Sequence, residues 1–248
     1  MRKPIQQIFF TGVTMKARVV VGAILAVIAC FVVNYATGGE NSVALAIKVV
    51  QDVSHKTATV DWSKAKKGDV LYSGDQVRTG ERSIAIVKFK DNSMLRVREN
   101  SELKLFGEDK DGKFSKTVHV DRGEFSFDIE KQQQNEQFTF TSPTSVASIR
   151  GTQGFMQSNQ GEDFLTVIDG LVNLLNTFSN NSVNVGSGQT GFSRPDGTID
   201  VRQATNDEKN RAEREVRAGQ GTGTEKSLDI ELQDNQGRKS LMRIRYRD

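Results

Sequence analysis

Hydrophobic and polar positions alternate with a period of two from about Ile47 to Val201, and short clusters of turn residues interrupt the alternation. A period of two is typical of strands with one buried face. Helical segments do not alternate with these strands, so a parallel α/β sheet is not indicated. The pattern predicts an all-β domain over residues 47–201, built of antiparallel hairpins that form a sandwich or a curved, solenoid-like roll.

The first predicted hairpin joins two alternating segments across Asp91-Asn92-Ser93. One register places four apolar side chains on the same face: Phe89 opposite Leu95 and Val87 opposite Val97. A slip of one residue would place a lysine opposite a leucine, so the hydrophobic pattern restricts the register.

Two further hairpins are predicted around glycine turns, at Arg122-Gly123 and at Asp169-Gly170. Glycine adopts the positive φ that a tight hairpin requires. The expected cross-strand pairs are Val120–Phe125 and Val118–Phe127 in the second hairpin, and Val167–Val172 and Leu165–Leu174 in the third. The third hairpin is apolar on both faces, so we expect it at the centre of a sheet.

A glycine-aspartate pair occurs twice around a short apolar segment, at Gly68-Asp69 and at Gly74-Asp75. Two successive turns that flank a short strand explain this repeat. A metal site at Asp69 and Asp75 would need more oxygen ligands than this segment offers, so no metal is expected.

An apolar run from Val19 to Val33 lies between Lys16 and Arg18 on one side and Glu40 on the other. With the residues up to 35 it approaches the ~20 residues that span a bilayer, and its charges predict an exported C-terminal part. We therefore expect a short cytoplasmic segment at residues 1–18, a signal anchor or signal peptide at 19–39 and membrane contact through residues 19–35.

Alternatives to a retained anchor remain open for this segment. Small residues at Ala36-Thr37-Gly38 and Ala44-Leu45-Ala46 suit signal-peptide cleavage. The sequence from Val27 to Cys30 resembles a lipoprotein acceptor site, and a buried helix of a soluble protein is a further interpretation. Translation could also start at Met15.

The C-terminal part predicts a short helix at residues 205–219 and then a linker with a terminal hairpin at 220–248. Thr205 and Glu208 have the spacing of a capping box, and Gly219 is a candidate stop. Because the apolar stripe consists of Ala212 and Val216 alone, we expect a solvated helix. The end of the hairpin is basic, which suits either an edge strand protected by charge or docking to an acidic partner, an anionic lipid or an envelope polymer.

Composition limits the chemistry that this chain can perform. Cys30 is the one cysteine, so an intrachain disulfide and a cysteine-based zinc site are excluded. The histidines are two, His55 and His119, and the net charge is +3. This charge is far from the basic footprint of a nucleic-acid-binding protein. We expect no nucleic-acid partner and no cofactor.

The segment from Thr141 to Phe155, TSPTSVASIRGTQGF, offers small hydroxyl residues before a glycine turn. It lacks the Gly-x-Ser-x-Gly frame of a nucleophile elbow and the glycines of a phosphate loop. A hydrolase using Ser145 or Ser148 would need His55 or His119 as its base, and nothing in the sequence brings either one close. We therefore predict a strand, a bulge and a turn, with Arg150 projecting beside the turn.

Several motifs occur together in a characteristic order: GDVLYSGDQVRTGERSIAIVKFKDNSMLRVRENSELKL, VDRGEFSFDI, FTFTSPTSVASIRGT and VIDGLVNLL. In this order the chain resembles the FecR domain family over roughly Ile47 to Phe192. The family is named for a membrane-spanning regulator of ferric citrate transport whose FecR domain lies in the periplasm. The resemblance implies an all-β envelope domain that mediates protein contacts without enzyme activity.

In the regulators of this family, a cytoplasmic N-terminal helical domain controls a sigma factor. Here 18 residues precede the apolar run, fewer than a folded helical domain needs. We therefore carry over the β domain alone and expect no direct anti-sigma activity.

The expected protein is a non-enzymatic component of the bacterial cell envelope. Its exported β domain would serve as a protein-interaction or ligand-sensing module for an envelope protein or a glycan. It would be a single-pass inner-membrane protein with a periplasmic C-terminal domain, or a secreted periplasmic protein if the signal is cleaved. The alternative is a signal-transducing regulator that acts with a separate anti-sigma or sigma partner. The candidate interaction residues are Arg150, Arg238, Lys239, Arg243, Arg245 and Arg247.

Overall fold

The computed structural model describes residues 42–110, 113–132, 136–220, 225–233 and 239–247. The predicted signal anchor at 19–39 and the candidate residue Arg238 lie outside these ranges. In the described part of the chain, no helix combines the length and the apolar character needed to cross a bilayer. The described fold begins with a strand at Ser42.

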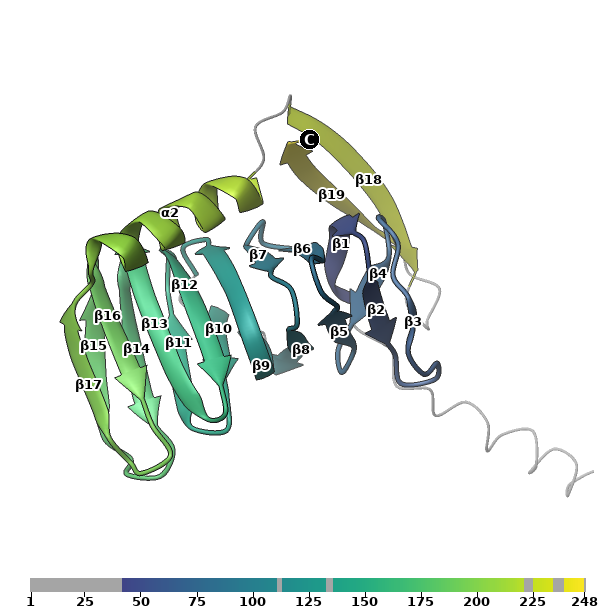
Figure 1. Ribbon diagram of the computed structural model, residues 1–248. Helices are drawn as coiled ribbons and strands as arrows, with labels where there is room; N and C mark the ends of the chain where they lie inside the picture. The colour runs from purple at the N-terminus through teal and green to yellow at the C-terminus, as the bar shows by residue number, and fades with distance from the viewer. Residues whose placement is uncertain (1–41, 111–112, 133–135, 221–224, 234–238, 248) are drawn as a thin grey trace, which may run out of the picture. The chain divides into compact units, whose positions relative to one another are not determined.

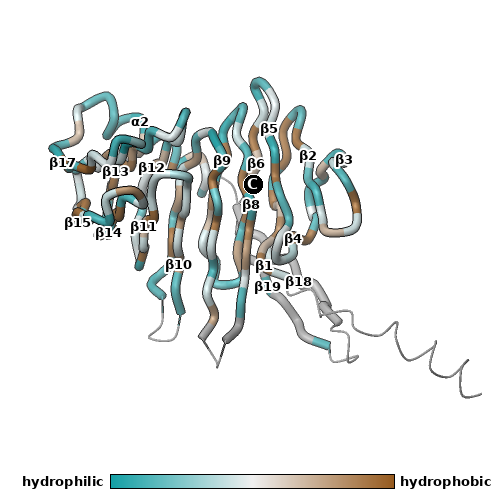
Figure 2. The backbone as a smooth tube through the Cα atoms, turned by 90° about the horizontal axis from the view of Figure 1, so that it is seen from below, coloured by the Kyte–Doolittle hydropathy of each residue, from teal (hydrophilic) through white to brown (hydrophobic). Residues whose placement is uncertain are grey.

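Backbone hydrogen bonds connect seventeen strands of the described chain. These strands form two layers, sheet A and sheet B (Figure 1). Sheet A contains β4 (Val70–Tyr72), β1 (Ser42–Val50), β6 (Ile84–Phe89), β7 (Met94–Val97), the second part of β9 (Lys113–Ile129), β12 (Thr152–Asn159), β13 (Glu162–Asp169), β16 (Gln189–Ser193) and β17 (Ile199–Gln203). Sheet B contains β3 (Ser63–Lys64), β2 (Val53–Lys56), β5 (Gln76–Thr79), β8 (Glu102–Lys110), the first part of β9, β10 (Glu136–Thr141), β11 (Ser145–Ile149), β14 (Leu171–Asn176) and β15 (Ser182–Gly186). Hydrophobic and hydrophilic residues alternate along many of these strands (Figure 2). The predicted β-rich fold class is thereby confirmed.

The hairpin between β6 and β7 is confirmed, but its register lies two residues from the predicted one. Val87 lies opposite Leu95, and the amide of Phe89 donates to the carbonyl of Ser93. Asn92 adopts a φ of 71°, which closes a tighter turn than expected. A shift of two residues keeps every side chain on its own face, so the predicted core residues remain in the core.

The predicted hairpin around Arg122-Gly123 is wrong. β9 continues as one strand through this point and passes from sheet B into sheet A. Gly123 has a φ of 114°, and a Cβ added there would lie 2.4 Å from the Cα of Ser101. Glycine therefore allows a crossing between the sheets instead of a chain reversal. The antiparallel pattern also has an exception here, because β10 runs parallel to the first part of β9.

The predicted hairpin around Asp169-Gly170 is also wrong. β13 pairs with β12 and β16 in sheet A, whereas β14 pairs with β11 and β15 in sheet B. The chain changes sheets at Gly170, which has a φ of 98°. Such a connection is a β-arc. Val167 and Val172 both lie in the core as predicted, but they belong to opposite sheets.

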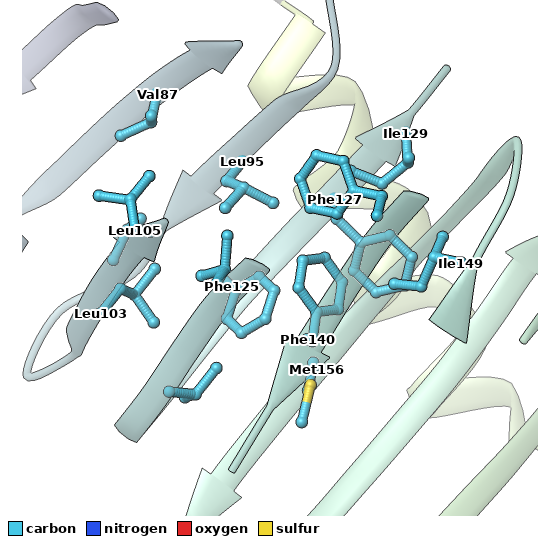
Figure 3. Packing of buried hydrophobic residues seen from close by; sticks show 14 of the residues in the cluster. Val87, Leu95, Leu103, Leu105, Phe125, Phe127, Ile129, Phe140, Ile149 and Met156 are labelled. Atoms are coloured by element: carbon cyan, nitrogen blue, oxygen red, sulfur yellow. The ribbon is translucent and has the colours of Figure 1, made fainter. Parts of the chain in front are cut away.

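The core lies between the two sheets and is rich in phenylalanine (Figure 3). Phe125 and Phe127 of sheet A contact Phe140 of sheet B, with ring centroids 4.9 and 5.0 Å apart. Phe138 meets Phe89 edge to face at 5.0 Å. Each of these rings is at most 1% exposed. Because burial of one such ring contributes roughly 2–3 kcal/mol, the aromatic cluster holds the sheets together.

Helix α2 (Asn206–Gln220) packs on the outer face of sheet A, where it contacts β7, β9, β12 and β13 (Figure 1). The predicted capping box is confirmed, because the Thr205 amide donates to the Glu208 carboxylate at 2.7 Å and the Glu208 amide donates to the Thr205 hydroxyl at 3.3 Å. The predicted solvated helix is wrong, since Ala212, Val216 and Gly219 are buried. Gly219 is a close-packing position inside the helix and not its stop.

The terminal hairpin is confirmed as β18 (Glu225–Gln233) and β19 (Lys239–Arg247). Its antiparallel register runs from Glu225 opposite Arg247 to Gln233 opposite Lys239.

Candidate functional site

The sequence-predicted interaction residues fall in two separate elements. Arg150 is exposed at the turn between β11 and β12, next to Gly151 with its φ of 63°. Lys239, Arg243, Arg245 and Arg247 all belong to β19, and the side chains of Lys239 and Arg243 are exposed.

The serines of the Thr141–Phe155 segment have structural partners. The hydroxyls of Ser142, Thr144 and Ser145 all donate to Oδ2 of Asp163, which is completely buried. The Ser145 hydroxyl lies 2.6 Å from that oxygen. These bonds tie the turn between β10 and β11 to β13, so Ser145 is occupied in an anchoring contact and not in a serine–histidine pair. Ser148 is exposed and lies opposite Asn173 of β14.

The glycine-aspartate repeat forms the two predicted turns. Oδ2 of Asp69 accepts from the Lys66 amide at 2.7 Å, and Oδ2 of Asp75 accepts from the Tyr72 amide at 2.8 Å. Gly68 has a φ of 97° in the first turn, as a type II turn requires. Across the described ranges, no cluster of three or more histidine, cysteine or acidic residues is arranged to hold a metal ion.

An open depression of about 540 Å³ lies on the outer face of sheet B, over β5, β8 and β9. Its residues are direct neighbours across the strands, since Gln76 pairs with Lys104, and Lys104 pairs with His119. The strands thus present a polar outer row above the apolar inner row. The lining residues are Gln76, Glu102, Lys104, His119, Asp121 and Arg122.

Glu102 organises the charges in this depression. Its carboxylate accepts two hydrogen bonds from Arg78, at 3.1 and 3.0 Å, and Arg122 approaches within 3.7 Å. The Arg78 guanidinium lies 3.9 Å from the centre of the Trp62 ring. The Glu102 side chain is 15% exposed, whereas that of Arg122 is 64% exposed. The Glu102 carboxylate therefore holds both Arg78 and Arg122, and Arg122 remains accessible to solvent.

His119 lies at the margin of the same depression. Its Nδ1 is 3.0 Å from the hydroxyl oxygen of Thr141, and its Nε2 is 3.6 Å from the Asp121 carboxylate. These two neighbours hold the imidazole in one orientation. We call the group Trp62, Arg78, Glu102, Lys104, His119, Asp121 and Arg122 the sheet B polar face.

The outer face of sheet A uses its charges differently. Glu215 of α2 pairs with Arg96 and with Arg98, the latter at 3.0 Å. Arg211 pairs with Glu124 and lies over the Phe155 ring. Burial, and secondarily the neighbouring Arg98, lowers the pKa of Arg96. These charges bind the protein's own helix, whereas those of the sheet B polar face meet solvent.

The sequence interpretation missed the sheet B polar face. The signal was present, because Gln76 and Arg78, Glu102 and Lys104, and His119 and Asp121 occupy alternate positions in their segments. Joining them requires knowing which strands are neighbours. The predicted hairpin at Gly123 placed the segment of His119 beside the wrong strand.

Comparison with known proteins gives one family match: the family model described as FecR protein matches residues 75–173. No curated protein matches the chain. Two crystal structures of a candidate anti-sigma factor from Parabacteroides distasonis ATCC 8503, at 1.65 and 2.50 Å resolution, are similar at 11% sequence identity with TM-scores of 0.43 and 0.44. The similarity covers 52% of this chain and 59% of theirs. As the ordered motifs of the sequence predicted, the chain carries a FecR domain, whose matched part runs from residue 75 to residue 173.

Proposed function

We propose that this protein is a non-enzymatic cell-envelope protein whose FecR domain recognises a protein partner through the sheet B polar face. The observation that carries the proposal is the difference between the two outer faces. Arg78, Asp121 and Arg122 have side chains that are 40%, 49% and 64% exposed, while the comparable charges of sheet A are paired with α2.

The chemistry of the sheet B polar face suits a protein partner. Arginine and tryptophan are enriched among the residues that contribute most to protein interfaces. Here Trp62 and Glu102 support the Arg78 guanidinium in one orientation, which reduces the entropy lost on binding. The three cations Arg78, Lys104 and Arg122 outnumber the carboxylates of Glu102 and Asp121. An acidic segment of a partner protein would complement this balance.

A regulatory function is the second candidate, and the match to the FecR family favours it. In this form of the proposal, the domain reports partner binding to a separate sigma or anti-sigma protein. The predicted signal anchor at residues 19–39 would hold the protein in the inner membrane, with the FecR domain in the periplasm. A cleaved signal would instead release the domain into the periplasm.

Cross-linking in intact cells, followed by purification of the full-length protein, tests partner recognition. Substitution of Lys104→Ala together with Arg122→Ala should abolish a specific cross-linked species. Arg217→Ala is the matched control, because Arg217 is 79% exposed on α2 and lies outside the sheet B polar face. An unchanged cross-link pattern in the double variant would rule out recognition through this face.

A separate transcription measurement tests the regulatory form. Deletion of the gene should change the transcription of a defined set of envelope genes, and the double variant should reproduce that change. Loss of the cross-link without any change in transcription would leave a binding module and eliminate the regulator.

A further inference from the structure

A second apolar cluster lies outside the core, on the outer face of sheet A. Leu45 and Ile86 belong to it, whereas their neighbours Ala44 and Val87 face the core between the sheets. Leu45 pairs with Lys88 and with Val70, so the cluster lies on β1, β4 and β6, and Met94 extends it to the start of β7. We call it the outer apolar patch. Its members are Leu45, Ile47, Val70, Ile84, Ile86 and Met94.

The centre of the outer apolar patch is buried although it points away from the core, and Val70, Ile84 and Met94 around it are partly buried. Leu45 is 1% exposed, Ile86 4% and Ile47 9%. A side chain on the outer face of a sheet reaches such values only beneath a further layer. Helix α2 forms that layer over β7, β9, β12 and β13, which leaves β1, β4 and β6 to be covered by another segment.

The chain leaves α2 beside this patch. The Gln220 side chain donates to Asp128 at 2.8 Å, and Asp128 lies opposite Met94 of β7. The next four residues, 221–224, can span about 13 Å when extended. That distance corresponds to nearly three strand spacings of ~4.8 Å, enough to carry the chain from β7 across β6 to β1.

The terminal hairpin that follows has two unlike faces. In its register, odd-numbered residues lie opposite odd-numbered residues, as Ser227 does opposite Arg245. The hairpin residues with a described exposure, Ser227, Lys239 and Arg243, are all exposed and all belong to this odd-numbered face. The register places six apolar residues on the other face: Leu228, Ile230, Leu232, Met242, Ile244 and Tyr246.

We propose that the hairpin β18–β19 packs its even-numbered face on the outer apolar patch and extends the third layer that α2 begins. The occupant is thus the protein's own C-terminal segment. Burial of apolar residues from both sides drives this contact, and a lone two-stranded hairpin needs such support to be stable. The odd-numbered face, to which the register assigns residues 243, 245 and 247, is then the outer face of the finished domain.

A cysteine cross-linking experiment on the full-length protein tests this contact directly. In a Cys30→Ser background, Ile86→Cys is combined with a single cysteine at each even-numbered apolar position of the hairpin in turn. At least one pair should form an intramolecular disulfide under mild oxidation. The matched controls pair Ile86→Cys with Asp229→Cys or with Arg243→Cys on the odd-numbered face, and these should remain reduced.

Hydrogen exchange supplies a second measurement that does not depend on cysteine geometry. Ile230→Lys should make the amides of β1 and β6 exchange at least about tenfold faster while those of β12 and β13 are unchanged. Arg243→Ala should leave all four strands unchanged. Cross-links that form only between two molecules would assign the cover to a second copy and overturn the proposal. Absence of even-numbered cross-links with unchanged exchange in Ile230→Lys would overturn it as well.

Discussion

The two outer faces of the sandwich both carry paired charged side chains and use them in opposite ways. On sheet A, Arg96 and Arg98 converge on Glu215, and α2 covers them. On sheet B, Arg78 and Arg122 converge on Glu102, and both arginines are exposed to solvent. The same motif of two arginines around one carboxylate therefore holds the helix on one face and is exposed to solvent on the other.

Burial explains why the arginine–glutamate pairs on sheet A contribute more to the free energy of unfolding than those on sheet B. The side chains of Arg96 and Glu215 are 10% and 14% exposed, so removal of one leaves the other poorly solvated. Arg122 is largely exposed and loses little hydration in its pair with Glu102. We expect substitutions on sheet A to change stability and those on sheet B to change binding.

The largest effect is expected for Glu215→Ala, which leaves Arg96 and Arg98 beneath the helix without their carboxylate. We expect the free energy of unfolding to fall by about 3–4 kcal/mol, measured by urea denaturation. Glu213→Ala on the exposed side of the same helix should cost less than about 0.5 kcal/mol. Equal losses in the two variants would contradict the assigned role of the sheet A cluster.

Gly123→Ala tests the point at which β9 passes from sheet B into sheet A. The added Cβ would meet both the side chain and the Cα of Ser101, and alanine disfavours the positive φ. We expect a loss of about 2–3 kcal/mol in unfolding free energy. Gly68→Ala is the control, because its φ is also positive but the space around it is open. It should cost about 1 kcal/mol, so similar losses would show that the close approach to Ser101 is unimportant.

Glu208→Gln probes how α2 is fixed at its N-terminus. Hydrogen bonds from Arg202 lower the pKa of Glu208 from 4.5 to about 2. A lowered carboxyl pKa stabilises the fold above about pH 4.5, and this contribution disappears as the pH falls through about 2. We expect Glu208→Gln to cost about 1 kcal/mol at pH 7 and nothing near pH 2. A loss that persists at low pH would show that the charge is irrelevant.

The smallest effect on stability is expected for Lys104→Ala with Arg122→Ala on the sheet B polar face. Surface substitutions of this kind change the free energy of unfolding by less than about 0.5 kcal/mol. Thermal denaturation should therefore give nearly equal curves for the variant and the parent protein. A marked destabilisation would mean that these cations are needed for folding, and it would remove the basis for the cross-linking test.

The sequence pattern predicted which residues are buried better than it predicted which strands are neighbours. Val167 and Val172 lie in the core as expected, yet they sit in different sheets. A hairpin and a β-arc produce the same alternation around a glycine, because in both the apolar residues on either side of the turn face one core. What distinguishes them is the hydrogen-bonding partner of each strand, which hydrophobicity does not encode.

The packing of the helix and the candidate site were missed for a related reason. α2 docks through Glu215 and Arg211 and through the small residues Ala212 and Gly219, so it lacks the broad apolar stripe that signals a packed helix. The sheet B polar face consists of residues from β5, β8 and β9 that are distant in the sequence. Their assembly depends on the continuous course of β9 through Gly123, where the sequence predicted a turn.

The arcs at Gly151, Gly170 and Gly188 have a consequence for how such a domain can change in length. Between arcs, the chain places one hairpin on sheet B (β10–β11), then on sheet A (β12–β13), then on B again (β14–β15) and on A again (β16–β17). Each later hairpin pairs with the hairpin that precedes it along the chain in the same sheet, through β11–β14 and β13–β16. Insertion or deletion of one hairpin in each sheet would preserve every earlier pairing. A domain of this kind can therefore change in length by one pair of hairpins without a change in the aromatic core.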